Sequence, residues 1–102
     1  MDIKAYNAFC EPLAHTSHVV QWGGSHVWKV DGKVFAIAGD DKQGGFRCSF
    51  KVSELAFDIL KEQPGCQGAP HLASRGMKWI QRFSEEAVDD EALKDYLLES
   101  YR

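Results

Sequence analysis

The segment QWGGSHVWKVDGKVFAI, residues 21–37, decides the fold, because it joins a clear hairpin signal to the densest run of aromatic residues in the chain. Asp31-Gly32 tolerates the positive φ angles of a type I′ turn, whose twist matches that of two paired strands. A two-residue loop fixes the pairing of the strands on either side. It predicts three cross-strand pairs: Val30 with Lys33, Trp28 with Phe35, and His26 with Ile37.

Side chains alternate between the two faces of a strand, so this pairing sorts the hairpin into a heavy face and a light face. The heavy face is suited to a core and comprises Trp28, Val30, Phe35 and Ile37. The light face comprises Val27, Lys29, Val34 and Ala36. A lone hairpin is only marginally stable in water, so further strands and helices must cover the heavy face.

Length and composition indicate one domain that spans residues 1–102, with a hydrophobic fraction of 44% that suffices for one core. The three cysteines are odd in number and lack CxxC spacing, which favours reduced thiols in a cytoplasmic protein. The N-terminal residues lack the basic and apolar regions of a signal peptide. No apolar run approaches the roughly 20 residues of a transmembrane helix, so we expect no membrane association. We expect a monomer or a weak oligomer.

Apolar spacing predicts an N-terminal helix that begins near Ile3 and ends near Glu11 or Pro12. Ser53 is placed to cap a second helix that runs to about Glu62, and Asp89 or Asp90 to cap a C-terminal helix. The predicted strands beyond the hairpin are 15–20, 46–51 and 77–83, and an irregular connection covers 66–76. These elements define an α+β fold, in which an antiparallel sheet carries helices on one face.

Alternation also predicts which way the outer elements face. In 46–51 the core side is Phe46, Cys48 and Phe50, and the other side is Arg47, Ser49 and Lys51. In 77–83 the core side is predicted to be Met77, Trp79 and Phe83, and the other side Lys78, Ile80 and Arg82. The buried stripe of the second helix is predicted to be Leu55, Ala56, Ile59 and Leu60.

The order of short motifs along nearly the whole chain resembles the MmcQ/YjbR-like family of small bacterial proteins. The motifs are Gln21-Trp22-Gly23, KVDGKVFA at 29–36, Phe50-Lys51-Val52, Gln63-Pro64-Gly65, APHLASR at 69–75, Lys78-Trp79-Ile80, Leu93 and Ser100-Tyr101. The resemblance implies a CyaY-like α+β fold, similar to a double-wing nucleic-acid module, and no established catalytic residues. The chain has His71 where the family often has Tyr, and Lys78 where many members have His, so no role is carried over to these two side chains.

The predicted alternation places five cations on the sheet face away from the core, with no acidic residue at the alternating positions between them. They are Lys29, Arg47, Lys51, Lys78 and Arg82. Such a face can pair with phosphates, which predicts a nucleic-acid-binding module of otherwise uncharacterised function. A solvated face that only keeps the domain soluble explains the same charges.

The acidic C-terminal segment bears on this hypothesis, because residues 84–102 hold seven acids against two bases. A helix packed beside the basic face would screen that face. A helix on the other side of the sheet would leave a polarised domain, which is better suited to bind nucleic acid. The sequence does not place the helix.

The alternative function is a protein-binding or small-ligand pocket around Trp22, His71, Arg75 and Trp79. Aromatic rings beside a cation stack on planar or anionic ligands, and the glycines at 23–24 and 65–68 would give the pocket mobile walls. Burial of both tryptophans in the core is the competing reading.

The hypotheses of enzymatic activity, metal binding and cofactor binding have weaker support. Asp40-Asp41 and Asp89-Asp90 are adjacent pairs with structural explanations in a loop and at a helix start. His18 and His26 can meet across neighbouring strands, but no group of ligands has the spacing of a zinc site. We therefore expect no enzyme, no cofactor and no metal.

Overall fold

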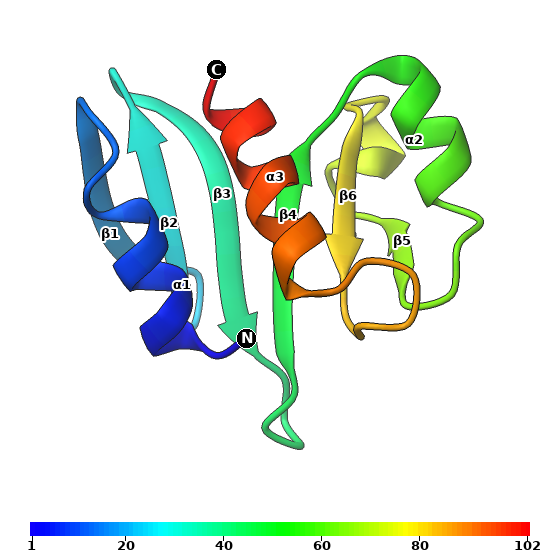
Figure 1. Ribbon diagram of the computed structural model, residues 1–102, viewed down its shortest axis with the longest axis horizontal. Helices are drawn as coiled ribbons and strands as arrows, with labels where there is room; N and C mark the ends of the chain where they lie inside the picture. Colours follow the sequence, from blue (N-terminus) through cyan, green and yellow to red (C-terminus); the bar gives the residue numbers. More distant parts are fainter.

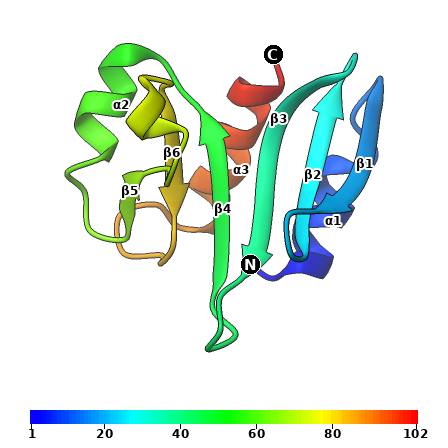
Figure 2. The ribbon, with the colours of Figure 1, turned by 180° about the vertical axis from the view of Figure 1, so that it is seen from behind.

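Six antiparallel strands form one sheet in the spatial order β1-β2-β3-β4-β6-β5. The computed structural model describes all residues from 1 to 102. The strands are β1 (Thr16–Gln21), β2 (Ser25–Val30), β3 (Lys33–Asp40), β4 (Phe46–Lys51), β5 (Cys66–Gly68) and β6 (Trp79–Arg82). Figure 1 shows helices α1 (Ile3–Cys10) and α3 (Asp90–Tyr101) in front of the same face, and Figure 2 shows the sheet from behind. The sheet therefore has one face that carries these helices and one that does not.

The three α-helices begin where the sequence supplies a polar cap. Asp2, Ser53 and Asp89 each accept a hydrogen bond from the backbone amide three residues onward, at 2.8, 3.2 and 2.8 Å. Such a bond satisfies one of the free N–H groups at a helix start. The helix predicted after Ser53 is α2 (Glu54–Leu60), which packs at the β5–β6 end of the sheet. None of the helices has the length and continuous apolar character of a transmembrane span.

The core lies between the sheet and the helices, and hydrogen bonds fix the helices on it. The Ser100 hydroxyl on α3 donates to the Phe35 carbonyl at 2.6 Å and accepts from the Lys51 amide at 2.9 Å. On α1, the Tyr6 hydroxyl donates to the His26 carbonyl at 3.0 Å, and Asn7 Oδ1 accepts from the Trp28 indole at 2.9 Å. The helix-covered face is thus both apolar and internally hydrogen-bonded.

The hairpin forms as predicted, but its register differs from the one expected. Asp31 and Gly32 have φ angles of 50° and 81°, as a type I′ turn requires, and Val30 pairs with Lys33. Beyond Lys29 the register shifts, so that Trp28 pairs with Ala36 and not with Phe35, and His26 pairs with Ala38 and not with Ile37. The cause is a β-bulge in which β3 has one extra residue. Ile37 consequently turns away from the helices.

The predicted faces of 77–83 are wrong, because Ile80 and Arg82 point to the helix-covered side. Ile80 pairs with Phe50, and Arg82 with Cys48, and all four side chains are buried. The residues predicted to face the core do not reach it: Met77 and Phe83 are exposed, and Trp79 is buried opposite Lys51, on the other side of the sheet. The aromatic residues of this segment suggested the wrong face.

Two smaller expectations also require correction. The buried residues of α2 are Phe57 and Leu60, whereas the predicted Leu55 and Ile59 are 73% and 54% exposed. The connection 66–76 is not wholly irregular, since it contains β5 and the 3-10 helix η1 (Ala73–Arg75). The alternation predicted for β4 is confirmed, with Cys48 and Phe50 in the core.

Candidate functional site

The sheet face opposite α1 and α3, which we call the open face, carries one row of side chains across four strands. The row runs through the cross-strand pairs Val27–Ile37, Ile37–Ser49 and Ser49–Gln81. The loop after β1 and the segment 69–75 rise on either side of it. Val27 and Ser49 in this row are buried, whereas Ile37 and Gln81 are partly exposed.

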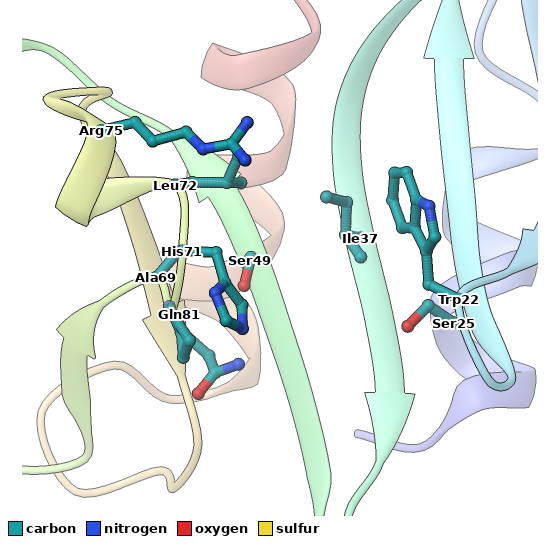
Figure 3. A pocket seen from close by; sticks show the side chains of 10 residues that line it. Trp22, Ser25, Ile37, Ser49, Ala69, His71, Leu72, Arg75 and Gln81 are labelled. Atoms are coloured by element: carbon teal, nitrogen blue, oxygen red, sulfur yellow. The ribbon is translucent and has the colours of Figure 1, made fainter.

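A hollow of about 500 Å³ lies on the open face between these two rims (Figure 3). This volume is within the range of small-molecule sites, roughly 300–1,000 Å³. The residues that line it are Trp22, Ser25, Ile37, Ser49, Ala69, Pro70, His71, Leu72, Arg75 and Gln81. None of them is a carboxylate or a thiol. We call this hollow the groove.

Trp22 forms one rim of the groove, and its backbone there is left-handed. It is the first residue of the loop between β1 and β2, and its φ angle is 52°. Bulky residues rarely adopt positive φ, and such conformations gather at ligand sites. The indole is 66% exposed, although a tryptophan on a domain of this size is normally well buried. The loop therefore presents a large flat ring to the solvent above the groove.

The opposite rim is a tight turn that ends in η1. The Ala69 amide donates to the Trp79 carbonyl at 2.9 Å, which joins the start of this turn to β6. His71 also has a positive φ angle, 69°, and its carbonyl accepts a hydrogen bond from the Ser74 hydroxyl at 2.8 Å. The Arg75 side chain extends inward from η1 (Figure 3). The turn thus brings an imidazole and a guanidinium to the groove.

The floor is neutral and able to form hydrogen bonds. Ile37 lies between the Ser25 and Ser49 side chains and supplies the apolar part. The side-chain Nε2 of Gln67 donates to Gln81 Oε1 at 2.7 Å. This hydrogen bond orients the Gln81 side chain and leaves the Gln81 Nε2 group free to donate to a ligand. Gln81 was not predicted as a site residue, because the predicted faces of β6 were inverted. The alternation of β4 did place Ser49 on the correct side.

A smaller hollow of about 160 Å³ continues the groove toward the β3–β4 loop and is lined by Asp40 and Arg47. The Arg47 guanidinium lies 3.4 Å from the Asp41 carboxylate. The backbone amide of Gly45, hydrogen-bonded at 2.7 Å, is the main reason that the pKa of Asp41 is lowered, and Arg47 contributes further. This end of the groove therefore carries both signs of charge.

The predicted five-cation face is not assembled. Lys29, Arg47 and Lys51 do lie on the open face. Arg82 was placed there wrongly: its side chain is 2% exposed, donates to the Val88 carbonyl at 2.9 Å, and pairs with Asp90 at 2.8 Å. Lys78 lies over the Phe57 ring of α2, with 5.0 Å between its ammonium and the ring centre. The prediction failed for β6 because its residues lie on the faces of the sheet opposite to those predicted.

Of the four residues predicted for the alternative pocket, three meet around the groove. Trp22 comes from the β1–β2 loop, and His71 and Arg75 come from the opposite rim. Trp79 is 5% exposed and does not line the groove. Its carbonyl instead accepts the hydrogen bond from the Ala69 amide at the start of the turn that carries His71.

Other reactive groups lie outside the groove. His18 Nε2 is 3.0 Å from His26 Nδ1, so these two histidines do meet across β1 and β2, but no group of three or more His, Cys, Asp or Glu side chains is arranged to hold a metal ion. All three cysteines are free and buried. Burial raises the pKa of Cys10 to about 12, and it also raises the pKa of Cys48 and Cys66. A raised pKa keeps a thiol protonated and weakly nucleophilic.

Comparison with known proteins places the chain in the YjbR family, since the model of that family matches residues 12–102. The chain therefore belongs to this family. No curated protein matches it. A Deinococcus radiodurans protein with a DUF419 domain is 20% identical, with a TM-score of 0.81 over 98% of this chain and 75% of the other. A Pseudomonas syringae protein is 15% identical, with a TM-score of 0.79 over 99% of this chain and 97% of the other. The likeness to these two structures shows a shared fold.

Proposed function

We propose that the protein is a binding module, not an enzyme, and that the groove of the open face holds a small ligand. The observation that carries the proposal is the meeting of exposed Trp22 and Arg75 on opposite rims of one hollow. An exposed ring and a cation around a concave surface provide stacking and charge in one place. The positive φ angles of Trp22 and His71 support the same conclusion, because strained backbone gathers where ligands bind.

Ligand binding without catalysis accounts best for the residues that line the groove. His71 is the only imidazole that lines the 500 Å³ hollow, and no carboxylate or thiol lines this hollow beside it. Nucleophilic catalysis needs an activated nucleophile next to a base, and general acid–base catalysis needs a positioned proton-transfer partner. The three reduced, buried cysteines support a cytoplasmic setting for this module.

The three tryptophans offer a direct test by NMR, because their indole N–H resonances report on different places. Trp22 lies on the groove, whereas Trp28 and Trp79 are buried. We expect a panel of soluble fragments to move the Trp22 indole and Gln81 side-chain amide resonances, while the Trp28 indole stays unchanged. A panel whose shifts gather elsewhere, for example on exposed Leu55 and Ile59 of α2, would refute the groove as the site.

Nucleic acid is the second candidate, and the position of α3 favours it. The acidic C-terminal helix packs on β3 and β4 from the helix-covered side, so it does not screen the open face (Figures 1 and 2). Lys29, Lys51 and Arg75 remain available there. A mobility-shift assay in low and moderate salt, with the Lys29→Gln/Lys51→Gln variant as control, tests this candidate. The nucleic-acid hypothesis requires salt-sensitive binding at micromolar protein concentration, and it requires the variant to bind more weakly.

A further inference from the structure

Arg75 differs from every other arginine of the chain in having no ionic partner. Arg47 pairs with Asp41, Arg82 pairs with Asp90 and Glu85, and Arg102 pairs with Glu99. Arg75 forms no ion pair, although it stands on the rim of the groove. A guanidinium presents several N–H donors in a planar fork that fits a carboxylate or a phosphate. The free fork of Arg75 is therefore suited to an anionic group.

The other rim selects for a flat ring. Trp22 presents an indole that is 66% exposed, and no other aromatic ring of the chain stacks on it. The ring projects from a residue with a left-handed backbone in the β1–β2 loop. An aromatic face that is left free in this way gains contact area and stacking energy from a planar partner.

The floor adds selectivity without adding charge. Gln81 Nε2 and the Ser25 and Ser49 hydroxyls are neutral groups that suit polar atoms on a ring. Ile37 supplies apolar contact among them. No carboxylate lines the 500 Å³ hollow itself, and Asp40 lines only the smaller hollow that continues it.

We infer that the ligand of the groove is a flat aromatic or heteroaromatic compound that bears one anionic group, a carboxylate or a phosphate. The ring stacks on Trp22, the anion pairs with Arg75, and polar atoms of the ring contact Gln81 and Ser49. This inference rests on the proposed function and narrows it, since a groove that binds neutral compounds would satisfy the proposal alone.

Matched probes test the inference by isothermal titration calorimetry, with NMR to locate each probe. The carboxylate pair is indole-3-carboxylate and indole-3-carboxamide. The phosphate pair is adenosine 5′-monophosphate and adenosine, and inorganic phosphate represents an anion without a ring. We expect at least one acid to bind about tenfold more tightly than its neutral partner, because a charge-assisted hydrogen bond contributes about that factor. The pair with the larger ratio identifies the type of anion.

Variants assign the effect to the two rims. Arg75→Gln should abolish the preference for the acid, while Arg102→Gln, which removes an exposed arginine at the C-terminal end of α3, should leave it unchanged. Trp22→Asn should weaken all ring-bearing probes by about tenfold, because one stacking contact accounts for about that factor.

Equal affinity for an acid and its neutral partner in both pairs would overturn the inference and leave the proposed function standing. Binding of inorganic phosphate as tight as that of the nucleotide would also overturn it, because the ring would then play no part. If none of the ring-bearing probes moves the Trp22 or Gln81 resonances at millimolar concentration, the inference fails, and the fragment panel decides the proposed function separately.

Discussion

Arg82 and Arg75 lie on opposite faces of the sheet and differ in whether they are paired within the chain. Arg82 lies on the helix-covered face, where Asp90 and the Val88 carbonyl satisfy its guanidinium. Arg75 lies on the open face and has no partner within the chain. A buried charge is tolerated only when it is paired, whereas an exposed charge is free to bind something else. Pairing within the chain therefore separates the structural cations from the candidate binding cations.

Trp28 and Trp22 repeat this contrast with aromatic rings. Trp28 is buried, and its indole N–H is hydrogen-bonded to Asn7 of α1. Trp22 lies only a few residues earlier in the chain, yet it projects into solvent from a strained loop. The helix-covered face holds the core, whereas Trp22 and Arg75 stand exposed at the groove of the open face, so substitutions of the two kinds of residue should differ accordingly.

The largest difference is expected between Arg82→Ala and Arg75→Ala. Loss of Arg82 leaves a cavity, frees the Val88 carbonyl and removes one partner of Asp90. It should lower the free energy of unfolding by about 3 kcal/mol, in line with other broken buried pairs. Arg75→Ala should change it by less than about 0.5 kcal/mol. Urea unfolding followed by far-UV circular dichroism measures both, and equal losses would show that the two faces do not differ.

A smaller contrast is expected between Ser100→Ala and Ser49→Ala. Ser100 bridges the Phe35 carbonyl and the Lys51 amide, so its loss leaves two backbone groups unsatisfied and should cost about 2 kcal/mol of stability. Ser49 faces the groove, and its replacement should cost under about 1 kcal/mol. Urea unfolding followed by far-UV circular dichroism measures the stability of both variants. A Ser49→Ala variant that is less stable than Ser100→Ala would mean that the groove floor is a second structural core.

The carboxyl of Asp90 allows a test with pH. The N-terminal amine, hydrogen-bonded at 2.8 Å, is the main cause that lowers the pKa of Asp90 below its ordinary 3.8, and Arg82 adds to the effect. A lowered pKa in the folded state means that the stabilisation is present above about pH 4 and is lost as the pH falls through the lowered value. Asp90→Asn should therefore cost about 1 kcal/mol at pH 7.

Below pH 4 the stability difference between the parent protein and Asp90→Asn should shrink toward zero. Thermal unfolding at a series of pH values from 7 to 2 follows this difference. A difference that stays constant down to pH 2 would contradict the assignment of a structural ion pair to this residue.

The smallest effect on stability is expected for Trp22→Asn. Asparagine tolerates the left-handed backbone at this position better than tryptophan does, and the indole buries little surface. Stability should stay within about 0.5 kcal/mol of the parent or rise slightly. Trp28→Phe, as the contrasting variant, should lose the Asn7 hydrogen bond and be clearly destabilised. A large loss for Trp22→Asn would show that Trp22 is a structural residue.

Much of the fold follows from local chemistry that the sequence displays. The Asp31-Gly32 turn, the Ser53 and Asp89 caps and the alternation of Phe46, Cys48 and Phe50 are each determined by near neighbours along the chain. The α+β class and the family were accordingly predictable.

The errors arose where distant contacts outweighed local pattern. Phe35 forms a bulge, so the hairpin register beyond Lys29 could not be counted from the turn alone. In β6, Trp79 suggested the core side, but the pairing with β4 places Ile80 and Arg82 there, and Asp90 from α3 neutralises the arginine. The predicted basic face lost two members as a result.

The candidate groove was partly predictable. Trp22, His71 and Arg75 were singled out as aromatic or charged residues in glycine-rich segments, and such segments form loops at the surface. Gln81 and Ile37 could not have been added, because their placement depends on the strand order and on the bulge. Loop residues thus identified the rims, whereas the floor required the assembled sheet.

The most direct measurement of the central claim is a crystal structure of the protein soaked with indole-3-carboxylate. We expect the compound to occupy the groove, with its ring against Trp22 and its carboxylate paired with Arg75. Occupancy at another surface, such as exposed Leu55 and Ile59 of α2, with the groove empty, would contradict the assignment of the open face as the binding face.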